Sequence, residues 1–255
     1  MKLFSRIYGE GDPLIILHGL FGMSDNWNTL GKRFSESFNV HVLDLRNHGR
    51  SPHANEFNYD VMCNDLSQYI EDNNLKDVIL VGHSLGGKLA MKYAFEFSEN
   101  IKKMIVVDIA PREYNVDFHK NLLNKLLQIS LNQFKQRKEV ENVMNQYGID
   151  KNISLFLLKN LYRDDFGSFL WRFNLKVLAS ELDNIKPADF ITGELQIPTL
   201  FIKGEKSNYI TEQDEIVISK YFKEVNFCTI NNAGHWVHAE NQDDFYRKAL
   251  DFCYL

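Results

Sequence analysis

Residues 78–86 read VILVGHSLG, and this stretch decides the fold. Its first four residues are apolar and predict a buried strand, and from Leu85 onward apolar residues recur every four positions, which predicts a helix. Gly82 and Gly86 allow a tight turn between the two elements, so that the Ser84 hydroxyl projects from the turn at the carboxyl end of the strand. The stretch therefore predicts a nucleophile elbow with Ser84 as the nucleophile.

The same alternation of short apolar runs with helical segments extends over much of the chain. Parallel strands joined by crossover helices have this pattern, because each strand is buried on both faces. We therefore predict an α/β fold with a mostly parallel sheet. The predicted strands cover residues 14–17, 40–43, 78–81, 104–107, 199–202 and 225–230.

The alternation stops between Pro111 and about Leu195, where the apolar spacing is helical and no buried strand is evident. Because the strand pattern resumes afterwards, we expect residues 112–194 to form a helical cap inserted into a core of residues 1–111 and 195–255. An independent helical domain is the alternative. Some aromatic side chains of this insertion could face a substrate, and we name three: Phe166, Phe169 and Trp171.

Composition and charge exclude several classes of protein. The chain has 255 residues, 44% of them hydrophobic, which is enough for a sizeable core. Its 34 acidic and 29 basic residues give a net charge of −5, and no long Lys/Arg cluster occurs, which argues against a nucleic-acid partner. Three cysteines without a CxxC pair predict reduced thiols and a cytoplasmic protein, and no apolar stretch is long enough for a membrane span.

The segment HGLFG, residues 18–22, follows the first apolar run and is a candidate oxyanion hole. An acyl-transfer enzyme needs two hydrogen-bond donors directed at the oxyanion. The backbone amides of Leu20 and Leu85 can supply them, with Phe21 as the neighbouring candidate. A glycine turn that only ends a strand is the alternative interpretation of this segment.

A serine nucleophile also needs a general base. His235 follows the last predicted strand, at the same sheet edge as Ser84, and is our candidate. His238 could instead join His235 as an i, i+3 metal-ligand pair, but no third ligand is evident, so we predict no metal and no cofactor. We interpret the following histidines as structural or ordinary polar positions: His18, His41, His53, His83 and His119.

These motifs together resemble the α/β-hydrolase superfamily over nearly the whole chain. The similar segments are HGLFG, DLRNHGRS (44–51), GHSLGG, VVDIAP (106–111) and GHW (234–236), and RNHGRS with VVDIAP is similar to the bacterial YbfF esterases and the ABHD11-type hydrolases. The resemblance implies an eight-stranded, mostly parallel sheet, a helical cap and cofactor-independent hydrolysis of esters or acyl thioesters. It also implies the chain order nucleophile, acid, histidine.

The acid departs from the usual superfamily pattern. It ordinarily follows the penultimate strand, but GEKS (204–207) has Ser207 at that position. We favour Asp108, which ends the run 104–107, because a carboxylate buried there needs a partner such as His235. A turn-forming or helix-capping Asp108 is the alternative, with Glu205 or Asp214 as the acid. Ser207 then has a supporting role.

The sequence therefore predicts a serine hydrolase for small-molecule carboxylic esters or acyl thioesters such as acyl-CoA, with a Ser84, His235 and Asp108 triad and an acyl-enzyme intermediate. The same triad would also serve a C–C hydrolase or a cofactor-free perhydrolase. A non-catalytic ligand-binding protein on this fold is the alternative from another class. We expect the turn at residues 44–48 to be a salt-bridged or hydrogen-bonded support beneath the site. The sequence indicates no oligomeric state.

Overall fold

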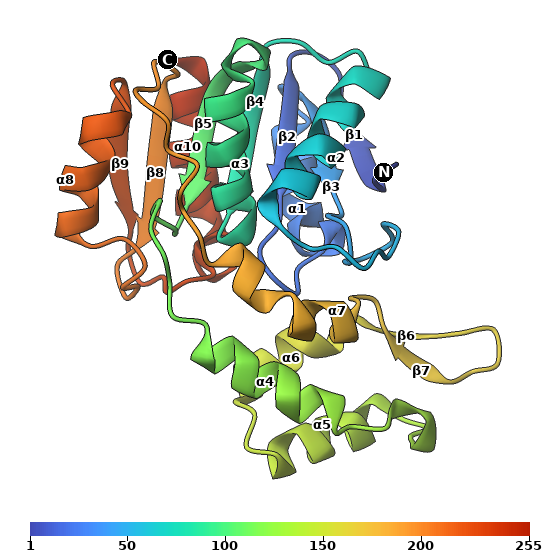
Figure 1. Cartoon of the computed structure of the whole chain (residues 1–255). Helices are drawn as coiled ribbons and strands as arrows, with labels where there is room; N and C mark the ends of the chain where they lie inside the picture. The colour runs from blue at the N-terminus through green and yellow to red at the C-terminus, as the bar shows by residue number, and fades with distance from the viewer.

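The computed structural model of the protein describes residues 1–255, and its centre is a seven-stranded sheet (Figure 1). The strand order is β1-β3-β2-β4-β5-β8-β9; every neighbouring pair is parallel except β1 and β3. The strands are β1 (Ser5–Tyr8), β2 (Pro13–Leu17), β3 (Asn39–Leu43), β4 (Val78–His83), β5 (Ile101–Val107), β8 (Thr199–Gly204) and β9 (Val225–Ile230).

The expected eighth strand is absent from this sheet, which is a correction to the sequence-based prediction. At the edge next to β1, residues 1–4 form no strand. The Phe4 amide donates to the Ser51 hydroxyl, the Phe4 carbonyl accepts from the Asp44 amide, and the Met1 amine contacts Asp65.

Helices cover both faces of the sheet, and alternate side chains of each strand contact one layer or the other. In β2, Ile15 packs into the core under α2 (Tyr59–Asp72), α3 (Leu85–Glu96) and α8 (Glu212–Tyr221). Its neighbour Ile16 packs into the opposite core, under α1 (Asn28–Phe34) and α10 (Gln242–Tyr254). Burial on both faces explains why the central strands are continuous apolar runs.

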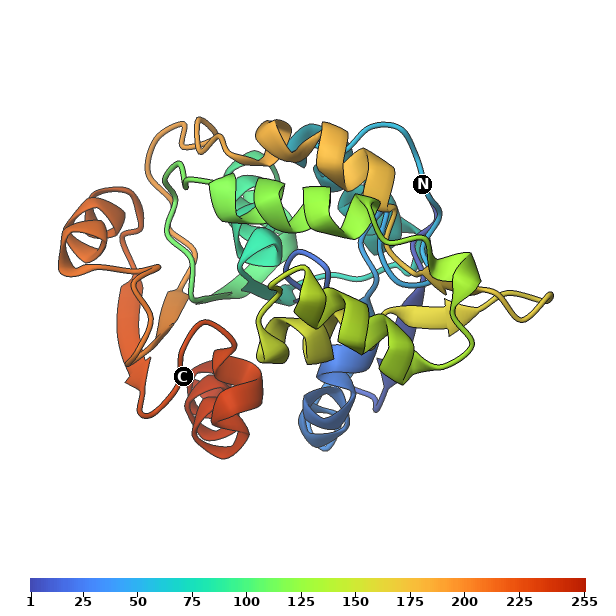
Figure 2. The ribbon, with the colours of Figure 1, turned by 90° about the horizontal axis from the view of Figure 1, so that it is seen from below.

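Between β5 and β8 the chain leaves the sheet and forms the segment of residues 112–194, which we call the inserted segment. It lies across the carboxyl edge of the sheet, as Figures 1 and 2 show. Its helices are α4 (Asp117–Leu127), α5 (Arg137–Gln146), α6 (Lys151–Leu158) and α7 (Leu175–Ser180). The remaining helical turns of the chain are α9 (Val237–Glu240) and 3₁₀ helices at Ser24–Trp27, Ser98–Asn100, Leu131–Gln133 and Leu182–Ile185.

The inserted segment also contains an antiparallel hairpin that the sequence pattern did not predict. Its strands β6 (Leu161–Arg163) and β7 (Phe169–Trp171) have three residues each, which is too short for a readable alternation. No helix of the protein combines the length and the apolar character that crossing a bilayer requires.

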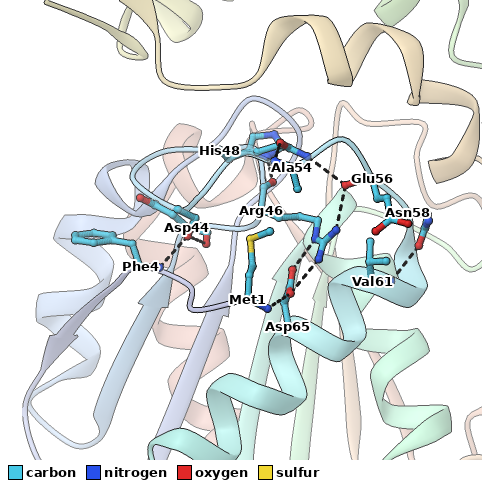
Figure 3. A network of polar contacts seen from close by, with 12 residues as sticks. Met1, Phe4, Asp44, Arg46, His48, Ala54, Glu56, Asn58, Val61 and Asp65 are labelled. Atoms are coloured by element: carbon cyan, nitrogen blue, oxygen red, sulfur yellow. Dashed lines mark hydrogen bonds and ion pairs between the residues drawn. The ribbon is translucent and has the colours of Figure 1, made fainter. Parts of the chain in front are cut away.

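The turn after β3 is held by a buried polar network (Figure 3). Arg46 donates from Nε and Nη2 to the two carboxylate oxygens of Asp65, at 2.6 and 3.0 Å. Asp44 accepts hydrogen bonds from the backbone amides of Ser24 and Arg50. Leaving one partner of such a buried pair alone is costly, so these contacts fix the turn after β3. The predicted supporting turn is therefore present.

Candidate active site

Ser84 lies in the turn between β4 and α3, with φ 52° and ψ −114°. This backbone conformation is strained for a residue with a side chain, and it directs the serine out of the turn. The turn closes only because the two flanking positions are glycines. A Cβ atom at Gly82 would overlap the Gly86 carbonyl, and one at Gly86 would overlap the Leu17 carbonyl.

Ser84, His235 and Asp108 form a continuous hydrogen-bonded line. His235 Nε2 lies 3.1 Å from Ser84 Oγ, and His235 Nδ1 lies 2.8 Å from Asp108 Oδ2. Asp108 directly follows β5, and His235 lies in the loop between β9 and α9. Because an ionised carboxylate only accepts, the Asp108 contact places the imidazole proton on Nδ1 and leaves Nε2 free to accept the serine proton.

The Asp108 carboxylate is fully buried and is satisfied by three donors. Besides His235, it accepts from the Gly204 amide at 3.0 Å and from the Ser207 hydroxyl. Ser207 thus contacts the carboxylate directly. Asp108 has φ 51°, a left-handed conformation that Asp and Asn tolerate better than most residues.

The two alternative acids lie elsewhere. Glu205 accepts a hydrogen bond from the Asn232 amide, and Asp214 pairs with Arg112 and caps α8 through Thr211. Neither carboxylate contacts His235.

The candidate oxyanion donors differ in their availability. The Leu20 amide has no hydrogen-bond partner. Leu85 is the first residue of α3, and amides of a first helical turn have no partner within their helix. The Phe21 amide, in contrast, donates to His48 Nε2 at 3.2 Å. The Phe21 amide is therefore engaged, whereas the Leu20 amide has no partner and the Leu85 amide has none within α3.

Four other histidines around the site are buried and structural. Burial lowers the pKa of His18 to about 4 and that of His48 to about 3, while each accepts a hydrogen bond from a backbone amide. Burial also lowers the pKa of His83 well below the usual value and that of His238 to about 3. His238 stacks on Trp27 with ring centroids 4.0 Å apart.

A cavity of about 220 Å³ opens at Ser84 under the inserted segment. The core contributes Leu20 and Trp236 to its wall, and α4 and α6 contribute apolar side chains. The residues from the inserted segment are Phe118, His119, Leu122, Ile153, Phe156 and Leu157.

Comparison with known proteins agrees with this fold. Residues 12–242 match the family described as the alpha/beta hydrolase fold. The chain belongs to the α/β-hydrolase family.

Three individual proteins are similar over 80% or more of their own length. Esterase YbfF of Escherichia coli is 32% identical, over 93% of this chain and 91% of its own. The sn-1-specific diacylglycerol lipase ABHD11 of Mus musculus is 34% identical, over 94% and 80%. A solved structure titled "Marine microorganism esterase" has a TM-score of 0.95 at 40% identity and covers 99% of both chains.

The site of this α/β-hydrolase also corrects one sequence-based expectation and adds residues. None of the three aromatics proposed to face a substrate lines the cavity: Phe166 is 93% exposed at the hairpin tip, and Phe169 and Trp171 are buried in the core. No sequence pattern indicated Tyr209, whose ring stacks on His235 at 3.8 Å. His119, expected to be an ordinary polar position, is a residue of α4 that lines the cavity beside Ser84.

Proposed function

We propose that the protein is a serine hydrolase that cleaves carboxylic esters or acyl thioesters, acyl-CoA among them, through an acyl-enzyme intermediate. The observation that carries the proposal is the hydrogen-bonded line from Ser84 through His235 to Asp108. The relatives named as an esterase and as a diacylglycerol lipase support a carboxylic ester hydrolase.

In the first half-reaction Ser84 Oγ attacks the carbonyl carbon of the substrate, and its proton passes to His235 Nε2. The carbonyl oxygen becomes an oxyanion, which accepts from the amides of Leu20 and Leu85. The Nε2 proton then passes to the leaving alcohol or thiol as its bond to the carbonyl carbon breaks. The product of this step is an ester of Ser84.

In the second half-reaction water attacks the acyl-enzyme. His235 takes a proton from the water and returns it to Ser84 Oγ as the acid is released. Throughout, the Asp108 carboxylate holds the imidazole in the required tautomer and stabilises its positive charge, while the Ser207 hydroxyl and the Gly204 amide hold the carboxylate.

The inserted segment acts in this proposal as a cap that provides the substrate cavity. Leu122, Ile153 and Phe156 of this segment line the 220 Å³ space together with Ser84. Burial of hydrocarbon here contributes up to about 0.8 kcal/mol per methylene. We therefore expect a small-molecule substrate with an apolar acyl or alcohol group.

A fluorophosphonate probe tests the proposal, because only an activated serine reacts with it. The probe should label the wild-type protein and the Ser219→Ala variant, in which an exposed serine is removed, but not Ser84→Ala. A panel of p-nitrophenyl esters and acyl-CoA thioesters should show turnover that falls by up to ~10⁶ in Ser84→Ala. Folded wild-type protein with neither labelling nor turnover would identify a ligand-binding protein instead.

A further inference from the structure

A second, smaller cavity of about 60 Å³ opens on another side of Ser84. It shares Leu20, Ser84, His119 and Tyr209 with the larger cavity, so the two spaces meet at the nucleophile. Its wall differs in chemistry because it contains two lysines: Lys186, whose ammonium group pairs with Asp183, and Lys88. The reaction described above has no use for the Lys88 cation.

Lys88 follows Ser84 by four residues, which places it about 6 Å, or one turn, further along α3. It is 3% exposed and forms no ion pair. Lys92, one turn beyond, differs in this respect, because its ammonium group contacts both Asp60 and Glu96.

The Lys88 ammonium group has one hydrogen-bond donor without a partner. Two of its three N–H groups donate to the carbonyl oxygens of Lys186 at 2.7 Å and Pro187 at 3.3 Å. The nearest rings, those of Tyr114 and Tyr59, have centroids 5.3 and 6.0 Å from Nζ and offer no acceptor atom in hydrogen-bond contact with it. A buried cation with a free donor is energetically costly unless an anion joins it.

We propose that the smaller cavity is an anion subsite, in which Lys88 binds a carboxylate carried by one side of the substrate. A space of about 60 Å³, beside about 220 Å³ for the larger cavity, suits a small carboxylate better than a hydrocarbon chain. The larger cavity then takes the apolar part. The inference rests on the proposed ester hydrolysis and adds a substrate class to it: esters or thioesters with a carboxylate a few bonds from the reacting carbonyl.

Two pairs of esters test the subsite on either side of the scissile bond. Methyl hydrogen glutarate has its carboxylate on the acyl side and is compared with methyl 5-methylhexanoate, in which an isopropyl group replaces the carboxylate. The anion of 3-acetoxypropanoic acid has its carboxylate on the alcohol side and is compared with 3-methylbutyl acetate. Acid release in a pH-stat gives kcat/KM for each. For one of the two pairs, the wild type should have a higher kcat/KM for the anionic ester than for the neutral ester.

Lys88→Met keeps the length of the side chain and removes the charge, whereas Lys88→Arg keeps the charge. In Lys88→Met the ratio of kcat/KM, anionic over neutral, should fall at least about tenfold, because a hydrogen bond to a charged group is lost. Lys88→Arg should restore most of the ratio. Lys92→Met, on the same helix but outside the cavity, should leave it unchanged. A lysine that only anchored Lys186 and Pro187 would change both esters of a pair alike.

A pH series on the wild type needs no variant. Burial lowers the pKa of Lys88 to about 8, so the anionic preference should decline between pH 7 and 9.5. The ratio cancels the titration of the catalytic groups, which both esters share. The pKa values of the facing tyrosines, His119 and Lys186 move away from the range of pH 7 to 9.5. Burial raises the pKa of Tyr59, Tyr114 and Tyr209 and lowers the pKa of His119 to about 4. Contact with Asp183 raises the pKa of Lys186. The groups facing or acting on Lys88 are Tyr59, Arg112, Glu113, Tyr114, His119, Lys186, Asp189 and Tyr209.

The outcomes separate the two proposals. No preference for either anionic ester in a wild type that hydrolyses the neutral esters overturns the subsite and leaves the proposed function intact. A preference that is independent of pH and is retained in Lys88→Met overturns the subsite in the same way. Absence of turnover with all four esters, together with no fluorophosphonate labelling, overturns the proposed function itself.

Discussion

Replacing Asp108 by asparagine removes the charge behind His235 with little change in shape. The asparagine oxygen can still accept from the Gly204 amide, and the left-handed backbone at this position suits asparagine. Its amide nitrogen, however, now faces His235 Nδ1 and can only donate. Nδ1 must then become an acceptor, which moves the imidazole proton to Nε2. In that tautomer the ring cannot take the proton from Ser84.

The expected loss in kcat is up to ~10⁴, or about 5.5 kcal/mol of transition-state stabilisation. Ser207→Ala removes one donor to the same carboxylate but leaves the charge and the tautomer in place. We therefore expect at most about a tenfold loss there. Glu205→Gln and Asp214→Asn change carboxylates that do not contact His235, and their kcat should stay close to that of the wild type.

Steady-state hydrolysis of p-nitrophenyl esters measures kcat for the four variants, and thermal unfolding shows that each is folded. Fluorophosphonate labelling of Asp108→Asn should be slow, since the nucleophile is not activated. The reasoning is refuted if Asp108→Asn is folded and active while Glu205→Gln or Asp214→Asn is as damaged as Ser84→Ala.

Two further predictions concern stability and substrate length. His18 and His48 have pKa values lowered to about 4 and about 3 from 6.5, so the unfolded chain binds more protons below pH ~6.5. The stability contributed by the two buried neutral rings is complete above pH ~6.5 and is lost as the pH falls below it. From pH 8 to pH 5 the free energy of unfolding should fall by about 2 kcal/mol per histidine, which is measured as a lower urea midpoint. An unchanged midpoint contradicts the burial of these histidines as neutral rings. The Ile153→Trp substitution narrows the larger cavity. As the acyl chain of the ester lengthens, kcat/KM should rise up to about fourfold per methylene in the wild type and much less in this variant. A flat wild-type profile would show that the inserted segment closes the cavity.

The sheet was largely predictable because its central strands are buried on both faces and leave continuous apolar runs. All six predicted strands are present. β1 was missed because its four residues are partly exposed and form an antiparallel edge, where no apolar run is required. The resemblance implied eight strands, and this number was wrong at the same edge of the sheet. Residues 1–4 lie beside β1 and form no strand, and they contact the side chains of Ser51 and Asp65.

The positions of Ser84, Asp108 and His235 follow from topology, because the carboxyl ends of parallel strands share one edge of a sheet. The side chains that complete the site do not follow from it. Tyr209 and His119 reach His235 and the cavity from a loop and from an inserted helix, whose orientation depends on packing that no periodicity encodes. The prediction that Phe166 could face a substrate failed in the opposite way. This aromatic residue belongs to an apolar stretch of sequence, but its side chain is exposed at the tip of the hairpin.

The insertion between β5 and β8 also determines when the protein can acquire its site during folding. These strands pair directly, Met104 with Thr199, although more than ninety residues separate them. Ser84 and His235 meet across 151 residues of chain. Contacts of such high sequence separation form late, because the entropy of closing the loop is lost before the contact stabilises the fold. Recovery of activity on refolding therefore reports the completion of the whole sheet, later than the appearance of helical structure.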